Sequence, residues 1–216
     1  MQKREFINIL TKTKVVPVIR HKDPDVAYRG AKLLAEAGFP VLEMTFTVPG
    51  AADLITRLSG ELPNAIVGAG TVLTDLQVHH AIKAGAQFVV SPCWTYDAAE
   101  VCIMDNIPYL PGAATPGEVL HHWQNGALAV KVFPAHETGG PGFLKAVKAV
   151  FPDIPLMPTG GVKPEQVADY LRAGAICAGL GGDLFPAAAL EAGDDDAARE
   201  QIAKARSAMA LDQPQA

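Results

Sequence analysis

The sequence predicts an α/β fold, a (β/α)8 TIM barrel with an extra N-terminal helix. Short runs rich in β-branched residues alternate with amphipathic stretches along the whole chain, and there are eight such runs. Because each intervening helix returns the chain in the same direction, the strands should be parallel, and eight parallel strands close naturally into a barrel. An open doubly wound sheet is the competing topology, but no G-x-G-x-x-G motif opens the first helix.

The elements follow in order along the chain. An amphipathic N-terminal stretch over residues 1–14 mixes apolar and charged side chains and supplies the extra helix. Thr115, Pro116 and Glu118 provide an N-cap, a first-turn proline and a capping-box acid, so a helix should begin there. The segment after residue 186, with Asp194, Asp195 and Asp196, is expected to be a solvated loop that leads into a last helix over 197–210. The expected strands cover 15–19, 41–46, 65–70, 87–92, 108–112, 127–133, 154–161 and 176–182, and amphipathic helices that end on glycine cover 25–38, 75–85 and 164–174.

Composition limits the class of protein. The 216 residues are 49% hydrophobic and contain no linker, so we expect one domain over 1–216. A net charge of -5 with dispersed Lys and Arg argues against nucleic acid or an anionic membrane as a partner. No apolar run reaches the length of about 18 residues that a membrane span needs, and the N-terminus lacks a signal peptide's apolar region. Cys93, Cys102 and Cys177 form no C-x-x-C and are expected to be free thiols in a reducing cytoplasm.

Two charged residues interrupt apolar strands. Lys131 stands in ALAVKVF and Glu43 in VLEMTF. Burying an unpaired ammonium costs several kcal/mol of hydration, which favours the neutral amine, and a neutral amine is a nucleophile. One interpretation is therefore a Schiff-base lysine with Glu43 as proton shuttle, in chemistry that needs no metal or cofactor. The alternatives are a structural ion pair, or a lysine that keeps its head in water at a strand end.

Other polar and glycine residues end the expected strands, where barrel chemistry lies. Arg20, Thr71 and Thr159 could hold a carboxylate or nearby oxygens. Glycine pairs in the last two strands expose backbone N–H groups that could receive a phosphate, and these are Gly160, Gly161, Gly181 and Gly182. The histidine pairs at 79–80 and 121–122 are interpreted as solvated helix residues, because adjacent helical side chains point apart and no carboxylate completes a metal site.

The chain resembles the class I 2-keto-3-deoxy-6-phosphogluconate (KDPG) and 4-hydroxy-2-oxoglutarate (KHG) aldolases. The resemblance covers nearly the whole chain and rests on ordered motifs: VVPVIR, LEMTFTVPGA, VGAGTVL, AGAQFVVSP, PYLPGAATPGE, AVKVFPA, MPTGGV and GLGGDLF. It implies a cytoplasmic, cofactor-free lyase that cleaves a keto acid to pyruvate and an aldehyde, either glyceraldehyde 3-phosphate or glyoxylate. It also implies a homotrimer.

The resemblance assigns roles to residues. Lys131 would form the Schiff base and Glu43 would move protons. Arg20, Thr71 and Thr159 would hold the pyruvate carboxylate and nearby oxygens, while Pro92 and Phe133 would wall the pocket. The four glycines of the last two strands would receive the phosphate.

Two departures from the family pattern leave the substrate open. Thr47 stands where many members have arginine, and Gly182 followed by Asp183 replaces a common serine. A phosphogalactonate-type or non-phosphorylated substrate therefore remains an alternative. Two further alternatives are a phosphate-binding barrel isomerase or epimerase with Glu43 as base, and a sugar-phosphate-binding barrel without catalysis.

Overall fold

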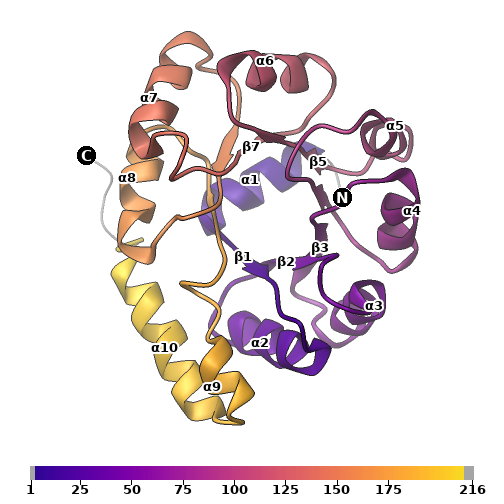
Figure 1. Cartoon of the computed structure of the whole chain (residues 1–216), viewed down its shortest axis with the longest axis vertical. Helices are drawn as coiled ribbons and strands as arrows, with labels where there is room; N and C mark the ends of the chain where they lie inside the picture. The colour runs from indigo at the N-terminus through magenta and orange to yellow at the C-terminus, as the bar shows by residue number, and fades with distance from the viewer. Residues whose placement is uncertain (1–2, 212–216) are drawn as a thin grey trace.

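The computed structural model describes residues 3–211 and shows parallel strands arranged in a ring with helices around them (Figure 1). The strands are β1 (Val15–Ile19), β2 (Val41–Thr45), β3 (Ile66–Gly70), β4 (Val89–Val90), β5 (Tyr109–Leu110), β6 (Gly112–Ala113), β7 (Val130–Val132), β8 (Leu156–Pro158) and β9 (Ala178–Leu180). The helices are α1 (Lys3–Thr13), α2 (Pro24–Glu36), α3 (Ala51–Glu61), α4 (Asp75–Lys83), α5 (Tyr96–Met104), α6 (Pro116–Gln124), α7 (Gly140–Val150), α8 (Val167–Arg172), α9 (Ala187–Glu191) and α10 (Asp195–Ala208), and a 3₁₀ turn, η1 (Pro164–Gln166), precedes α8. The single-domain prediction over 1–216 also includes residues 1–2 and 212–216, which lie outside the described residues.

The ring consists of two hydrogen-bonded sheets. One has the order β5-β4-β3-β2-β1-β9 and the other the order β6-β7-β8. The sheets meet at two seams. At the first, Pro111 separates β5 from β6 within one extended segment, and at the second an isolated parallel bridge joins Thr159 to Gly179. Counting β5 and β6 as one segment gives the eight expected strands, so the predicted (β/α)8 fold is confirmed.

The strands are shorter than the sequence runs suggested. Only Val89–Val90 of 87–92 and Leu156–Pro158 of 154–161 are regular strand. Proline has no N–H to donate, and prolines stand in or beside these segments, so the ladders stop early.

The acidic segment near the C-terminus differs from its prediction. The prediction of a solvated loop through residues 194–196 is wrong, because Asp194 caps α10 by accepting a hydrogen bond from the Ala197 N–H at 2.9 Å. Asp195 and Asp196 lie in the first turn, where the helix dipole favours negative charge. The short helix α9, which the sequence did not indicate, precedes them.

Two local predictions hold. The capping box at α6 is present: Thr115 Oγ1 accepts from the Glu118 N–H at 3.2 Å, and the Thr115 N–H donates to Glu118 Oε2 at 2.9 Å. The extra N-terminal helix is also present, and in Figure 1 α1 lies behind the ring of strands. Its Phe6 and Leu10 are buried in the cluster that fills the lower barrel, with Val16, Val41, Phe88, Val90, Leu110, Ala129, Met157 and Cys177. Across residues 3–211, none of the helices has the length and apolar character that crossing a bilayer requires.

Candidate active site

Strand alternation brings the polar residues to the barrel interior. Successive side chains point to opposite faces of a strand, so Val41 and Glu43 of β2 share a face, as do Ala129 and Lys131 around β7. Val41 and Ala129 belong to the apolar floor of the lower barrel. Glu43 and Lys131 therefore stand one layer above that floor, toward the carboxyl ends of the strands.

Lys131 and Glu43 face each other across the barrel. Lys131 Nζ lies 3.9 Å from Glu43 Oε1, and the two residues are 3% and 0% exposed. This distance is short enough for an ion pair but too long for a hydrogen bond. Both carboxyl oxygens of Glu43 are buried without a hydrogen-bond partner among the described residues. Nζ also lies 5.0 Å from the centre of the Phe133 ring. The pair is thus enclosed and incompletely satisfied, an arrangement that functional sites often contain.

Burial raises the pKa of Glu43 above its ordinary value. Desolvation of the carboxylate is the largest cause, and the positive charges of Lys131 and Arg20 oppose it. The protonated carboxyl can donate a proton, and once it has done so the carboxylate can take one back. Glu43 therefore has the character of a group that exchanges protons.

Gly70 in β3 makes room for Glu43. A Cβ at position 70 would lie 2.1 Å from Glu43 Oε1 and 2.6 Å from its Cγ. Gly179 does the same for Thr159, whose Oγ1 would lie 2.3 Å from a Cβ there. These glycines are needed because the barrel interior must hold large polar side chains at this level.

A cavity of about 280 Å³ opens above Lys131. Of the residues that the sequence singled out, it brings together Arg20, Lys131, Phe133, Thr159, Gly160, Gly161, Gly181, Gly182 and Asp183. Thr159 is 5% exposed and its Oγ1 is buried without a partner among residues 3–211. Gly160 and Gly161 have φ of 93° and 70°, a left-handed backbone that favours glycine.

Thr71 supports Arg20 at the mouth. The Arg20 guanidinium donates from Nη2 to Thr71 Oγ1 at 3.3 Å. Thr71 has a φ of 56°, which is unusual for a β-branched residue and costs of the order of 1 kcal/mol or more. Thr47, the departure from the family pattern, lies with its Oγ1 2.8 Å from Thr45 Oγ1.

Some predicted site residues lie elsewhere, and others were missed. Glu43 lies beneath the cavity and Pro92 is not among its lining residues; the Pro92 carbonyl instead packs against Gly112, where a Cβ would approach it to 2.0 Å. The cavity is also lined by Val18, Val162, Gly179, Phe185 and Ala187. Alternation from Val16 could have identified Val18, but no sequence signal identified Phe185 or Ala187.

The interpretation of His121 and His122 as solvated and pointing apart is wrong. His122 is 4% exposed, its Nε2 lies 3.0 Å from the Gly112 carbonyl oxygen, and its ring stacks on Trp94. The two histidines approach within 3.3 Å at Nδ1. Burial lowers the pKa of His122. The second pair, His79 and His80, is exposed on α4 as expected.

The cysteines are free, as predicted. Cys93 is exposed, whereas Cys102 and Cys177 are buried. Burial raises the pKa of the Cys102 thiol to about 12. Within the described chain no three His, Cys, Asp or Glu side chains gather in a way that could hold a metal ion.

Comparison with known proteins identifies the family to which this chain is similar. The family model for KDPG and KHG aldolase matches residues 6–201. The KHG/KDPG aldolase of Escherichia coli K12 is 40% identical over 189 residues, which are 88% of this chain and 89% of that protein. The 2-dehydro-3-deoxy-phosphogluconate aldolase of Dickeya dadantii is 38% identical over 201 residues, 91% and 94% of the two chains.

A solved structure agrees with the sequence relatives. The KDPG aldolase from Legionella pneumophila, crystallised with pyruvate captured at low pH as a covalent carbinolamine intermediate, superposes with a TM-score of 0.84 at 31% identity over 99% of each chain. A match of this extent in sequence and structure, around an enclosed amine and carboxyl, means that the chain belongs to the KDPG and KHG aldolase family.

Proposed function

We propose that this chain is a Schiff-base lyase that cleaves KDPG, 4-hydroxy-2-oxoglutarate or both to pyruvate and an aldehyde. The single observation that carries the proposal is the buried amine of Lys131, 3.9 Å from a buried carboxyl with a raised pKa and beneath an open cavity. The covalent pyruvate adduct of the Legionella relative supports the same reaction type.

Bond making begins at Lys131. Lys131 attacks the C2 carbonyl as the deprotonated amine, and the carbinolamine forms. Protonated Glu43 gives its proton to the carbinolamine hydroxyl, which leaves as water, so that a cationic imine remains on Lys131. The resulting Glu43 carboxylate then takes the proton of the C4 hydroxyl. The C3–C4 bond breaks, its electrons flow into the imine to form an enamine, and the aldehyde leaves.

Pyruvate is released by the reverse of imine formation. The enamine takes a proton at C3 from Glu43, and water then adds to C2 of the imine while the Glu43 carboxylate takes the proton that the water loses. Loss of the amine regenerates Lys131 and frees pyruvate. Every step uses only side chains of this chain, substrate and water, so no cofactor is proposed.

The cavity suggests where the rest of the substrate lies. Arg20 is the basic side chain at the mouth, and with Thr71 and Thr159 it would hold the carboxylate and neighbouring oxygens. Phe133 would line the cavity beside the reacting carbons of the substrate. A phosphate would lie against the backbone of Gly160, Gly161, Gly181 and Gly182, which line the cavity and have no side chain of their own to shield their N–H groups.

Borohydride trapping tests the nucleophile. Treatment with borohydride and pyruvate should convert Lys131 to its N-carboxyethyl derivative, found by peptide mass spectrometry, and should abolish activity. An unmodified Lys131 in folded protein that still releases pyruvate would refute the assignment. Glu43→Gln should bind substrate with little change in KM while kcat falls by about 10²- to 10⁴-fold, the usual contribution of a general acid–base.

We also propose a homotrimer that works in the cytoplasm. Large apolar side chains are exposed on α4, α5 and α6 and just before α4, namely Leu73, Leu76, Tyr96, Ile103, Met104 and Trp123, and a second copy would cover them. Sedimentation equilibrium measures the mass directly. A trimer that Met104→Glu dissociates would support this surface, and a monomeric parent chain would refute the proposal.

A further inference from the structure

The cavity has a distal wall that does not come from the barrel strands. Phe185 and Ala187, which line the cavity, lie after β9 and at the start of α9. In the proposed function the reacting carbons lie at Lys131, so the far end of the substrate extends toward this wall. Its position therefore affects how well a long substrate fits.

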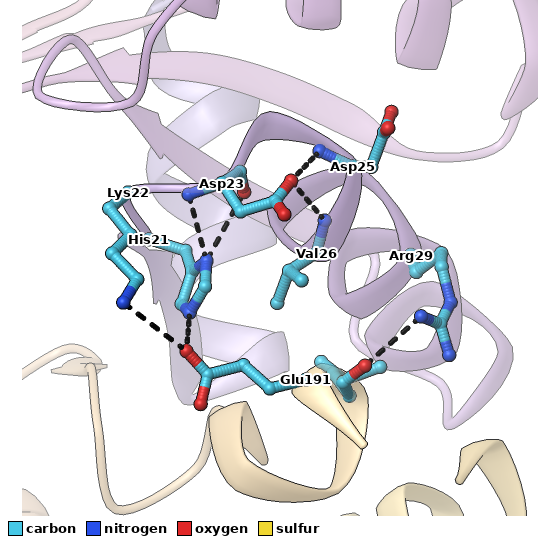
Figure 2. A network of polar contacts seen from close by, with 8 residues as sticks. His21, Lys22, Asp23, Asp25, Val26, Arg29 and Glu191 are labelled. Atoms are coloured by element: carbon cyan, nitrogen blue, oxygen red, sulfur yellow. Dashed lines mark hydrogen bonds and ion pairs between the residues drawn. The ribbon is translucent and has the colours of Figure 1, made fainter. Parts of the chain in front are cut away.

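His21 connects this wall to the loop that carries Arg20. Figure 2 shows the His21 ring between the first turn of α2 and the end of α9. Its Nε2 lies 3.1 Å from Glu191 Oε1, and its Nδ1 accepts a hydrogen bond from the Asp23 N–H at 3.0 Å. Nδ1 also lies 3.2 Å from the Asp23 carbonyl oxygen, and because a carboxylate oxygen can only accept, Nε2 is the donor in the contact with Glu191. The His21 side chain is 9% exposed, whereas the Glu191 side chain is 49% exposed, so the ring is shielded from water while the carboxylate is open to it.

The α2 end of this connection is rigid. Asp23 is the N-cap of α2, and its Oδ1 accepts from the N–H groups of Asp25 at 2.8 Å and Val26 at 3.4 Å (Figure 2). The same aspartate that orients His21 therefore also closes the first turn of the helix. A capped helix start fixes the ring more firmly than a free loop would.

The α9 end has its own contacts with α2. Arg29 donates from Nη1 to the Leu190 carbonyl at 3.0 Å and pairs with Asp195. Phe185 packs against Gly30, where a Cβ would lie 2.2 Å from its ring. The His21 ring centre is 6.2 Å from that of Phe185. These contacts support the base of α9, whereas the His21–Glu191 bond holds it beside Arg20.

We propose that His21 is a positioning residue that, through Glu191, holds the α9 wall against the Arg20 loop and so sets the affinity for the distal part of a long substrate. This role rests on the proposed function. It predicts an effect that depends on substrate length. The phosphorylated end of KDPG would reach the α9 wall, whereas 4-hydroxy-2-oxoglutarate has only two carbons beyond the C3–C4 bond and would not reach it.

Steady-state kinetics on both substrates test the role. His21→Ala and Glu191→Ala should each raise KM for KDPG about tenfold, the scale of one lost hydrogen bond to a charged group, with kcat within about threefold of the parent. KM for 4-hydroxy-2-oxoglutarate should stay within about threefold. The double variant should be no worse than Glu191→Ala alone, since that change already removes the His21 contact together with a 4.0 Å pair between Glu191 and the exposed Lys22 (Figure 2). Glu191→Gln retains an acceptor oxygen for His21, so its KM for KDPG should be close to that of the parent.

Controls separate this role from general stability and from the reaction itself. Arg199→Ala removes another contact with α2, a 3.5 Å pair between Arg199 on α10 and Glu36, and should leave both KM values unchanged. Glu191 is half-exposed, so its variants should fold even if His21→Ala does not. Equal increases in both KM values, or no increase, in active folded variants would overturn the positioning role. A parent chain that releases no pyruvate from either substrate would instead overturn the proposed function.

Discussion

Replacing Gly70 by alanine should damage catalysis through a single methyl group. The added Cβ would lie 2.1 Å from Glu43 Oε1 and 2.7 Å from its Cδ, whereas ordinary contact begins at 3.4 Å, so the carboxyl must withdraw by more than 1 Å. Glu43 is fully buried and cannot swing into solvent. Overpacking of this kind costs about 1–3 kcal/mol, and misplacement by about 1 Å can cost about 10²-fold in rate.

Two glycines provide matched controls. Gly68→Ala would press on the Phe88 ring at 2.3 Å in the barrel floor, so it should cost similar stability without displacing Glu43. Gly60 lies within α3, and no atom of the described residues comes within 4 Å of a Cβ added there, so Gly60→Ala should stabilise by about 0.5–1 kcal/mol. Urea denaturation and a lactate dehydrogenase-coupled pyruvate assay measure both effects. A folded Gly70→Ala enzyme with kcat within about threefold of the parent would refute the reasoning.

Three further predictions concern stability. Burial lowers the pKa of His122, so the unfolded chain takes up a proton first as pH falls through the ordinary value of 6.5, and the free energy of unfolding should decrease. His122→Gln should lack this pH-dependent component, which thermal melts followed by the fluorescence of Trp94 would measure. A His122→Gln variant with the same dependence of stability on pH as the parent would contradict the prediction. Thr115→Ala should cost about 1 kcal/mol in urea denaturation and Thr115→Ser much less. The Glu118 pKa is lowered, first by the Ala114 N–H, so its stabilisation is present above the ordinary 4.5 and should disappear as pH falls through the lowered value.

The sequence was most informative where a residue contradicts its surroundings. A charge within an apolar strand has few structural explanations, so Lys131 and Glu43 could be found from ALAVKVF and VLEMTF alone. Alternation then placed both on the inner face of the barrel. The capping box at Thr115 could be predicted equally well, because its contacts join residues three apart in the chain.

Contacts between distant segments could not be predicted. Pro92 lies two residues beyond the end of β4, and its carbonyl packs on Gly112, a residue of another strand, so Pro92 does not line the cavity. His122 is buried since Trp94, from another loop, covers it. The α9 wall arises from a short apolar stretch with no periodicity long enough to indicate a helix.

The two seams of the barrel have a consequence for the reacting pair. Glu43 belongs to the six-stranded sheet and Lys131 to the three-stranded one. The distance between amine and acid therefore depends on how the two sheets meet. On one side the chain runs from β5 to β6 through Pro111, and the Leu128 N–H donates to the Tyr109 carbonyl at 2.9 Å; on the other side the Ile176 N–H donates to the Leu156 carbonyl at 3.0 Å, beside the Thr159–Gly179 bridge. A substitution that shifts the backbone at either of these junctions should therefore change the distance between amine and acid, and with it the rate of proton exchange.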